Sequence, residues 1–446
     1  MRNLLVVVMT VFANSVMAAD LQSRVDEYLN PYLQTNNFQG VVLIAKDDEI
    51  LMVKGYGMAN IEQAVPNTPE TVFHIASVSK PFTAAGIMLL ADEGKVELDA
   101  PLSDVIPEYS QSDELTLHHL LAHTSGIPNI NNFEEYGDIQ LHAQTPESLL
   151  EYFKDLPLEF DPGSQYSYSN SNYNLLALVI ERTSEQSFGD YLSRRVLAPA
   201  KTKSAAHDSE PTAIIPHRAD GYSPDGLFGI RRAPWLDWTA KTGNGSMVAT
   251  ADDLFIWTRA FFNDGIVTPA DRAMMLSEHT PNVGYGWFIR PRHGRPQYHI
   301  NGRSPGFSSY LGYYPDDNVT IVVLSNLYNS ITTSVGTDVA AMVFGVPYEV
   351  PHLSAEQLPA SVAAGVPGRF QYGADFYNAN VVVTLELRDG HVHQLWGDGG
   401  FESALIPKGD DQFVDRAFWS EVAFVRDENG VVVELQFDGF SAERIE

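Results

Sequence analysis

The pattern of apolar and polar residues predicts mixed α and β structure over most of the chain. Two β-rich runs flank a polar turn in GVVLIAKDDEILMVKGYG, residues 40–57, which predicts a hairpin. Apolar residues recur at helical spacing over 83–93 and 173–183, with Pro- and Gly-containing loops between them, which predicts two helices. Two further strands are predicted at 307–314 and 319–324, on either side of the turn PDDN.

The pattern changes towards the C-terminus. The segment VPYEVPHLSAEQLPASVAAGVPG, residues 346–368, carries four prolines and no clear period, which is typical of a linker. Beyond it, VVVTLELRDGHVHQLW and VAFVRDENGVVVELQF alternate between apolar and polar residues around Asp389-Gly390 and Asn429-Gly430, dipeptides that favour hairpin turns. This end of the chain is therefore predicted to be an all-β module.

Length and composition limit the class of protein. A chain of 446 residues favours two domains over one, because a single hydrophobic core rarely grows so large. Hydrophobic residues make up 44%, which is ordinary for a globular protein. Asp and Glu number 57 against 28 Lys and Arg, a formal charge of -29, and no run of basic residues offers contacts to phosphates. We therefore expect no nucleic-acid partner.

The first residues, MRNLLVVVMTVFANSVMAAD, are typical of a secretory signal. They combine a positive start at Arg2, an apolar run from Leu4 to Ala13 and small residues before Asp20. The run is too short to span a bilayer and no cysteine follows it to carry a lipid, so we expect a periplasmic or secreted chain without a stable membrane anchor. Because the sequence has no cysteine, disulfides, a thiolate nucleophile and Cys-ligated metals are excluded.

Candidate chemistry lies in HIASVSKPFTAAGIMLLADEG, residues 74–94. A serine hydroxyl is a weak nucleophile that attacks a carbonyl only when a neighbour takes its proton. On a helix, residues three apart lie on one face with about 5–6 Å between Cβ atoms, so Lys80 can reach Ser77. A lysine has a pKa of about 10.4, and Lys80 acts as a base near neutral pH only if burial or a second cation lowers it. The alternative is a capping serine beside an exposed lysine.

The surrounding sequence favours the first interpretation. The segments FHIASVSKPFTAAGIMLLADEGKVELDAPLSDVIPE, LTLHHLLAHTSGIP and FDPGSQYSYSNSNYNLLALVIE, the last with Tyr168-Ser169-Asn170 at a Tyr-x-Asn motif, resemble the serine β-lactamase and penicillin-binding-protein-like hydrolases. This family includes class C β-lactamases, D-alanyl-D-alanine carboxypeptidases and related esterases. The resemblance extends over residues 25–345 and implies an α/β fold, with an antiparallel sheet, flanking helices, and Ser77 between the sheet and a mostly helical region.

The resemblance also implies a mechanism that needs no cofactor. Ser77 attacks the substrate carbonyl, Lys80 and Tyr168 share the movement of its proton, and water cleaves the resulting acyl-enzyme. Either Lys80 or Tyr168 can be the base on these grounds. The backbone N–H of Ser77 would form half of the oxyanion hole, and Asn170 of the second motif would lie at the substrate.

The third element of the family, normally Lys-Thr-Gly or His-x-Gly on an edge strand ahead of Gly-Phe, departs from its pattern. The tripeptide at residues 241–243 reads Lys-Thr-Gly, but we reject it because it runs into NGSMVATADDLFIW, which resembles a different family segment. In YHINGRSPGFSSYLGYYPDDNVTIVVLSN, counting back from Phe307 assigns the motif to residues 300–302, Ile-Asn-Gly.

Ile300 therefore stands where the family usually has a cation. Gly302 and the N–H of Arg303 remain to complete the oxyanion hole, and Asn301 and His299 are further candidates for contact with the substrate. Without the charge at position 300, we expect neutral esters or uncharged amides to be cleaved better than penicillins.

Two other patterns are set aside. GRSPG at residues 302–306 matches the lipase elbow G-x-S-x-G, but an elbow uses the N–H after its nucleophile as an oxyanion donor, and proline has none. His119 and His123 have helical spacing but lack the glutamate that follows the first histidine in zinc proteases, so no metal site is expected.

These observations predict a secreted serine hydrolase for small ester, amide or D-amino peptide substrates. The alternatives are a penicillin-binding-like protein that binds peptidoglycan or a partner without turnover, and a true β-lactamase or D-alanyl-D-alanine carboxypeptidase. The expected division is a signal peptide at 1–19, a hydrolase domain at 20–348, a linker at 349–365, and an antiparallel β-barrel or sandwich at 366–446. The oligomeric state is not predicted.

Overall fold

The computed structural model describes residues 19–209, 212–263, 265–397, 401–409 and 411–445. All but the last residue of the expected signal peptide lies outside these ranges. Within them, no helix is both long enough and apolar enough to cross a membrane.

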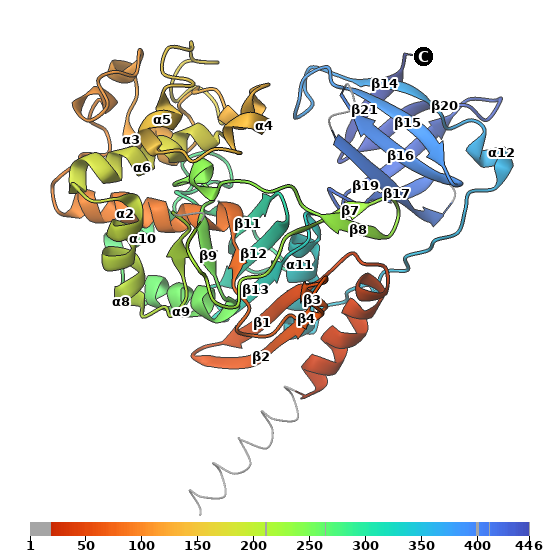
Figure 1. Ribbon diagram of the computed structural model, residues 1–446, viewed down its shortest axis with the longest axis horizontal. Coiled ribbons are helices and arrows are strands. Elements are labelled where there is room, and N and C mark those ends of the chain that lie inside the picture. Colours follow the sequence, from red (N-terminus) through yellow and green to blue (C-terminus); the bar gives the residue numbers. More distant parts are fainter. Residues whose placement is uncertain (1–18, 210–211, 264, 398–400, 410, 446) are drawn as a thin grey trace, which may run out of the picture.

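A six-stranded antiparallel sheet forms the centre of the N-terminal part (Figure 1). In spatial order its strands are β10 (Phe288–Ile289), β11 (Tyr298–Ser304), β12 (Phe307–Tyr314), β13 (Val319–Ser325), β1 (Gly40–Lys46) and β2 (Glu49–Tyr56). The predicted hairpin and the two strands predicted near residue 315 are confirmed. The first and last strands of the chain's hydrolase-like part thus pair with each other, through β1 and β13.

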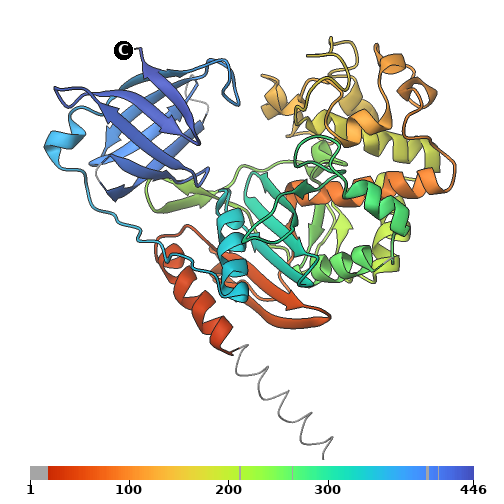
Figure 2. The same cartoon turned by 180° about the vertical axis from the view of Figure 1, so that it is seen from behind.

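Both faces of the sheet are covered, which explains why its central strands read as unbroken apolar runs. Alternate residues of a strand point to opposite faces. Val41 and Leu43 of β1 belong to the core shared with the helical region, whereas Val42 and Ile44 face the helix at residues 19–34 and α11 (Ile331–Phe344). In Figure 2 these two helices lie over the second face.

The helical region packs on the first face of the sheet. Its two longest helices here, α2 (Lys80–Asp92) and α6 (Asn170–Ser184), confirm the two predicted from periodicity and lie side by side. They approach closely at Gly86, where an added Cβ would lie 3.0 Å from Ile180 Cδ1.

The other helices of this part are α3 (Leu117–Leu121), α4 (Tyr136–Ile139), α5 (Pro146–Leu150), α7 (Phe188–Leu192), α8 (Ala198–Ala200), α9 (Ala251–Phe262) and α10 (Pro269–Met275). Short pairings complete this part: β3 (Met58–Asn60) with β4 (Val65–Pro66), β5 (Phe73–His74) and β6 (Ala206–His207) with β9 (Met247–Ala249), and β7 (Tyr222–Asp225) with β8 (Gly229–Arg232).

The C-terminal module is a closed antiparallel barrel rather than a sandwich. Its strands are β14 (Gly368–Tyr372), β15 (Val382–Arg388), β16 (His391–Trp396), β17 (Phe401–Gly409), β18 (Gln412–Asp415), β19 (Glu421–Arg426), β20 (Val432–Phe437) and β21 (Phe440–Arg444). The predicted turn at Asp389-Gly390 joins β15 to β16, with positive φ at both residues as a two-residue hairpin loop requires. Closure leaves no free strand edge.

The connection between α11 and the barrel contacts both parts. It contains one short helix, α12 (Ala360–Ala363). Leu353 packs against the core under α11, while Leu358 packs against the barrel core and its N–H donates to the Gly390 carbonyl at 3.3 Å. Much of the predicted linker is therefore held against protein.

Arg416 joins the barrel to the rest of the chain. Its guanidinium is buried and donates four hydrogen bonds, to Asn37 Oδ1 at 2.8 Å and to the carbonyls of Asn36, Asp225 and Gly226 at 3.0, 3.2 and 2.7 Å. Burial lowers its pKa to about 10. All four acceptors lie outside the barrel, so this side chain binds the barrel to the rest of the chain, together with the ring contact between Trp419 and Tyr32 at 5.4 Å.

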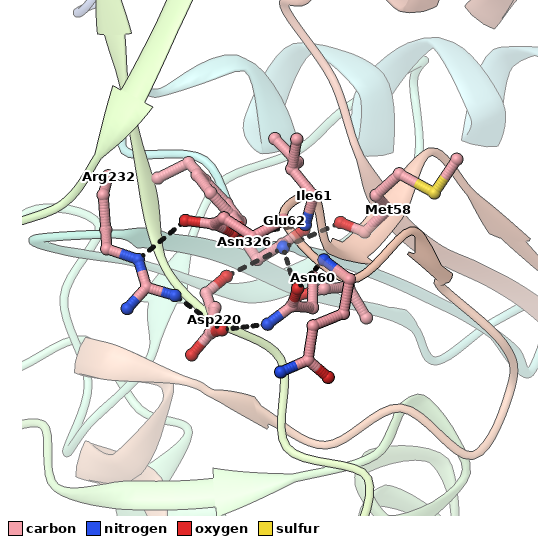
Figure 3. Close-up of polar contacts among 10 residues, drawn as sticks. Met58, Asn60, Ile61, Glu62, Asp220, Arg232 and Asn326 are labelled. Carbon is pink, nitrogen blue, oxygen red and sulfur yellow. Dashed lines mark hydrogen bonds and ion pairs between the residues drawn. The ribbon is translucent and has the colours of Figure 1, made fainter.

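The hairpin β7–β8, which supplies two of those acceptors, is itself tied to the sheet by a polar network (Figure 3). Arg232 pairs with Glu62 at 2.9 Å and with Asp220 at 3.0 Å, so it bridges the hairpin and the chain after β3. Asn60 donates to the same Asp220 carboxylate, and Asn326 donates to the Asp220 carbonyl at 2.9 Å. The hairpin β7–β8 thus contacts Arg416 of the barrel on one side and, through Arg232 and Asp220, the chain next to the sheet on the other.

We expect Arg416→Ala to lower the free energy of unfolding by about 2–4 kcal/mol, because it leaves several buried acceptors without a donor. Urea unfolding and limited proteolysis of residues 349–365 would measure the effect. Arg388→Ala is the matched control, since Arg388 lies on the same barrel but pairs with Glu386 and Glu402 at an exposed position. Equal effects of the two substitutions would contradict the assigned role of Arg416.

Candidate active site

Ser77 lies where the chain passes from a strand into a helix. After β5, Ala76 adopts φ of 47°, a left-handed conformation that is rare for a non-glycine residue. Ser77 then sits in the 3-10 turn Ala76–Ser79, directly before α2. The Ile75 carbonyl accepts a hydrogen bond of 2.6 Å from Ser309 Oγ on β12, which ties this turn to the sheet. The resulting sharp turn brings Ser77 next to β11.

Two of the predicted side chains, those of Lys80 and Tyr168, meet at the Ser77 hydroxyl. Lys80 Nζ lies 3.2 Å from Ser77 Oγ, and Tyr168 Oη lies 3.0 Å from the same atom. Lys80 Nζ also donates to Asn170 Oδ1 at 2.9 Å and to the Asn244 carbonyl at 2.8 Å. A neutral lysine has two N–H bonds, so these two acceptors can hold both and leave the nitrogen lone pair directed at Ser77.

The surroundings favour a neutral Lys80 and a protonated Tyr168. Lys80 is 1% exposed, and burial, reinforced by the charge of Lys241, lowers its pKa well below the usual value. Burial raises the pKa of Tyr168, although its hydrogen bond with Ser77 opposes the rise. Of the two groups, only Lys80 is shifted towards the form that accepts a proton.

Gly302 lies against the backbone of Ser77. A Cβ at position 302 would be 2.8 Å from Ser77 N and 2.5 Å from the Ile75 carbonyl oxygen. Any larger residue would therefore displace the turn or occupy the space beside the Ser77 N–H. This close approach is a reason for glycine at this position that does not depend on the motif.

Two other residues of β11, Ile300 and His299, point to opposite faces of the strand. Ile300 lines a small cavity with Lys80 and Tyr168, whereas His299, on the opposite face, packs against Phe288 and Tyr310. Burial and two nearby arginines lower the pKa of His299 to about 3. The structure does not bring His299 to Ser77.

Arg303 lies within β11, and the turn follows it at Pro305-Gly306. It contributes to the cavity around Ser77, but its guanidinium stacks on Tyr328 at 4.2 Å and on Phe418 of the barrel at 4.7 Å from the ring centres. Ser304 closes the β11–β12 hairpin opposite Phe307 and is followed by a strand, so it has no elbow geometry.

Lys241 is the residue that the sequence interpretation missed. It lies on a 3-10 turn (Trp238–Lys241) away from the sheet edge, which agrees with its rejection as the third motif. Its ammonium nevertheless lies in the cavity of Ser77, 2.8 Å from Tyr136 Oη and 3.4 Å from Gln140 Oε1. No carboxylate pairs with it among the residues that the structure describes. The neutral Ile300 therefore does not leave the cavity without a positive charge.

The cavity around Ser77 measures about 250 Å³ and is strongly polar. The residues lining it are Ser77, Asn131, Tyr136, Gln140, Asn170, Lys241, Asn244, Gly245, Arg303, Ser304, Pro305 and Tyr328. Asn131 accepts a hydrogen bond of 3.0 Å from Asn170 Nδ2. No local sequence signal distinguishes Asn131, Gln140 or Asn244, because each comes from a different loop or turn.

His123 supports Tyr168 and the backbone beside it. Its ring lies 4.5 Å from that of Tyr168, and its Nδ1 accepts from the Ser169 N–H at 3.2 Å. Burial lowers its pKa well below the usual value, so the ring is neutral. Among the described residues there is no group of three or more His, Cys, Asp or Glu side chains arranged to hold a metal ion.

Known proteins with this fold and site make the family clear. The model of the family described as "Beta-lactamase" matches residues 25–341, and the chain belongs to this family of serine β-lactamases and penicillin-binding-protein-like proteins. Penicillin-binding protein 4* of Bacillus subtilis (strain 168) is 27% identical over 447 residues, which cover 92% of this chain and 95% of that protein. The match therefore includes the barrel as well as the hydrolase-like part.

Solved structures agree in fold. The octameric penicillin-binding protein homologue from Pyrococcus abyssi has a TM-score of 0.66 at 23% identity and covers 95% of this chain and 99% of its own. The D-amino acid amidase from Ochrobactrum anthropi SV3, complexed with L-phenylalanine amide, has a TM-score of 0.65 at 22% identity and covers 73% of this chain and 99% of its own. At these identities the likeness concerns the fold alone.

Proposed function

We propose that this protein is an exported serine hydrolase that cleaves an ester or amide through an acyl-enzyme on Ser77. The observation that carries the proposal is the convergence of Lys80 Nζ and Tyr168 Oη on Ser77 Oγ, at 3.2 and 3.0 Å. Acyl transfer requires a nucleophile within hydrogen-bond distance of a proton acceptor, and that acceptor must be oriented by other groups. Here Ser77 is the nucleophile, Lys80 the acceptor, and Asn170 and the Asn244 carbonyl orient Lys80.

In this mechanism Lys80 is the base of the acylation step. It takes the proton of Ser77 as Oγ attacks the carbonyl, because its pKa is lowered while that of Tyr168 is raised. Tyr168 passes its proton to the leaving group as the bond from the carbonyl carbon to that group breaks, and it takes back the proton that Lys80 holds. Lys80, neutral again, takes a proton from water as the water oxygen attacks the acyl-enzyme. The bond from the carbonyl carbon to Ser77 Oγ then breaks, and this proton returns to Oγ, which releases the acid and regenerates Ser77.

The oxyanion hole consists of two backbone N–H groups, those of Ser77 and Arg303. Gly302 keeps the space beside Ser77 N free. Ser304 and Phe307 close a hairpin with a two-residue loop, and pairs along an antiparallel ladder alternate in hydrogen bonding. When Ser304 and Phe307 form a hydrogen-bonded pair, the next pair, Arg303 and Ser308, is a non-hydrogen-bonded one. The N–H of Arg303 then points away from β12, towards the substrate.

Small esters, amides and D-amino peptides are the proposed substrates. The polar cavity suits an amino-acid-like group, and the name of the amidase with the same fold supports amides among the candidates. The pattern of residues 1–19 supports export to the periplasm or the medium.

Acylation tests the proposal directly. The protein is incubated with a fluorophosphonate or a fluorescent penicillin, digested, and analysed by mass spectrometry for a label on Ser77. Stable binding of a peptidoglycan fragment without any covalent label would instead support a non-hydrolytic binding protein, an alternative that the altered third motif at residues 300–302 allows.

A true β-lactamase or D-alanyl-D-alanine carboxypeptidase is a second candidate, favoured by the ammonium of Lys241 in the Ser77 cavity. This cation is available for the carboxylate that such substrates carry. Hydrolysis of nitrocefin at a kcat/KM above that for p-nitrophenyl acetate would select this candidate over a general esterase.

The pH dependence of acylation is expected to respond to Lys241. Since the charge of Lys241 helps to lower the pKa of Lys80, Lys241→Met raises that pKa. A base acts in its neutral form, so the rise of kcat/KM for p-nitrophenyl acetate with pH is expected to move to higher pH. Lys154→Met, which removes an exposed lysine paired with Glu151, is the control for net charge. An unmoved profile in Lys241→Met would contradict the coupling of the two lysines.

A further inference from the structure

A second, larger cavity lies between the barrel and the edge of the sheet. It measures about 730 Å³ and is lined by Asn301, Ser330, Phe376, Tyr377, Asn378, Val381, Trp396, Gly397, Phe401, Phe418, Ser420, Phe437 and Asp438. All but the first two belong to the barrel, and they come from strand ends and connections at one end of it. We call it the barrel-mouth cavity.

The barrel-mouth cavity adjoins the cavity of Ser77 along β11. Asn301 lines the first, Arg303 lines the second, and Gly302 between them touches the backbone of Ser77. Neighbouring residues of a strand are only about 3.3 Å apart along it. The guanidinium of Arg303 lies 4.7 Å from the ring centre of Phe418, which lines the barrel-mouth cavity, so one side chain separates the two.

The strand between the cavities has a free edge. β10 pairs with β11 only at Tyr298 and His299, so among the residues that the structure describes no strand pairs with residues 300–304 on that side. Figure 1 shows the barrel and the helical region on either side of this end of the sheet. A ligand whose carbonyl lies at Ser77 can therefore cross the edge of β11 towards the barrel.

Tyr377 lies on the side of the barrel that meets the sheet. It lines the barrel-mouth cavity together with Asn301 of β11. Its ring packs against those of Phe376 and Phe440, with ring centres 5.2 and 5.1 Å apart, which holds it at the rim of the barrel.

The linings differ in chemistry. The Ser77 cavity is small and holds Lys241 among amides and hydroxyls, whereas the barrel-mouth cavity has six aromatic rings, one carboxylate and no basic residue. Aromatic walls of this kind receive apolar and aromatic groups. The rings are already packed on one another, as for Trp396 and Phe418 at 5.5 Å, so the wall is preformed.

We infer that the barrel-mouth cavity is a substrate subsite that binds an uncharged aromatic or branched apolar group of the compound cleaved at Ser77. The barrel is then a specificity element of the enzyme. This inference rests on the proposed function and adds to it the class of substrate, which is an ester or amide with a bulky apolar group several bonds from the scissile carbonyl.

Two series of esters test the inference on the full-length protein. The p-nitrophenyl esters of acetate, phenylacetate, 3-phenylpropionate and 4-phenylbutyrate vary the acyl side, and acetates of the matching phenylalkyl alcohols vary the leaving group. In one of the two series we expect kcat/KM to rise by roughly tenfold or more over the smallest member. Tyr377→Ala, which removes a ring that is 74% exposed, is expected to abolish most of that rise. Tyr152→Ala removes a tyrosine ring of the helical region that is 37% exposed and does not line the barrel-mouth cavity; it is the control and should leave the ratio unchanged.

The outcomes separate this inference from the proposed function. If acetate hydrolysis survives Ser77→Ala, the proposed function is wrong, and the inference fails with it. If acetate hydrolysis depends on Ser77 but both series are flat, or the rise persists in Tyr377→Ala, only the subsite is wrong. Thermal unfolding of each variant shows that the barrel is intact.

A cationic occupant is the remaining possibility that the test addresses, because aromatic rings beside Asp438 also suit an ammonium group. The better ester is prepared with a para tert-butyl group and with its isostere, trimethylammonium. Preference for the tert-butyl compound supports the inference. Preference for the cation that is lost in Asp438→Asn would overturn it.

Discussion

Ser77→Ala is expected to reduce kcat/KM for p-nitrophenyl acetate by a factor on the order of 10⁴ or more, because no other hydroxyl is held by both Lys80 and Tyr168 in the described structure. The assay is release of p-nitrophenol, with circular dichroism and thermal unfolding as evidence that the variant is folded. Removal of the single Oγ atom leaves the cavity and its cations in place.

Ser304→Ala is the matched control for this prediction. Ser304 lies in the sequence GRSPG, which matches G-x-S-x-G, and lines the same cavity, yet it ends a strand and precedes a proline. Its variant is expected to stay within about tenfold of the wild type, since it loses a wall contact and not the nucleophile. The reverse result, an inactive Ser304→Ala and an active Ser77→Ala, would show that the nucleophile has been assigned wrongly.

Lys80→Met is expected to lower kcat/KM by roughly 10²–10⁴, the usual contribution of a general base. Methionine keeps the length of the side chain and is apolar, so at a site that is 1% exposed it suits the buried position, and folding should be retained. The rate of labelling by a fluorophosphonate should fall in parallel, because both reactions begin with attack by Ser77.

The pH profile distinguishes Lys80 from Tyr168 as the base. In Lys80→Met, the ascending limb at low pH should disappear from the residual activity, whereas in Tyr168→Phe it should stay where it is in the wild type. A limb that persists in Lys80→Met and is lost in Tyr168→Phe would transfer the role of base to Tyr168.

Much of the fold could be predicted because its signals are local. The strand at residues 307–314 has the predicted bounds, α6 includes the predicted stretch 173–183, and α2 covers 83–92 of the predicted stretch 83–93. Burial on both faces of β1 agrees with its unbroken apolar run, and the hairpin at Asp389-Gly390 follows from positive φ at both residues. Whether the C-terminal strands form a sandwich or a barrel could not be read, since closure depends on pairing β14 with β21, which are about 70 residues apart in sequence.

In the candidate site, too, contacts between neighbours in sequence could be predicted, whereas contacts that depend on the fold could not. Ser77 and Lys80 are three residues apart, so their contact follows from helical geometry once the segment is identified. His299 shares a short segment with Gly302 but belongs to the opposite face of β11, and no assignment by motif position could bring it to Ser77. Lys241 is part of a Lys-Thr-Gly tripeptide that does not lie on the edge strand. Its ammonium reaches the Ser77 cavity from a 3-10 turn, which the motif does not predict.

The amino-acid pattern alone was sufficient to predict the family, the Ser-x-x-Lys motif at residues 77–80, the α/β character of the larger part and the all-β character of the C-terminal part. These follow from short-range spacing and periodicity, which the chain carries locally. Three features became visible only in the folded protein: Lys80 is buried near a second cation, Arg416 bonds the barrel to the rest of the chain, and the barrel contributes an aromatic cavity near the site of Ser77. Burial, charge coupling and shared cavities depend on which distant segments pack together, and so on contacts that no local pattern specifies.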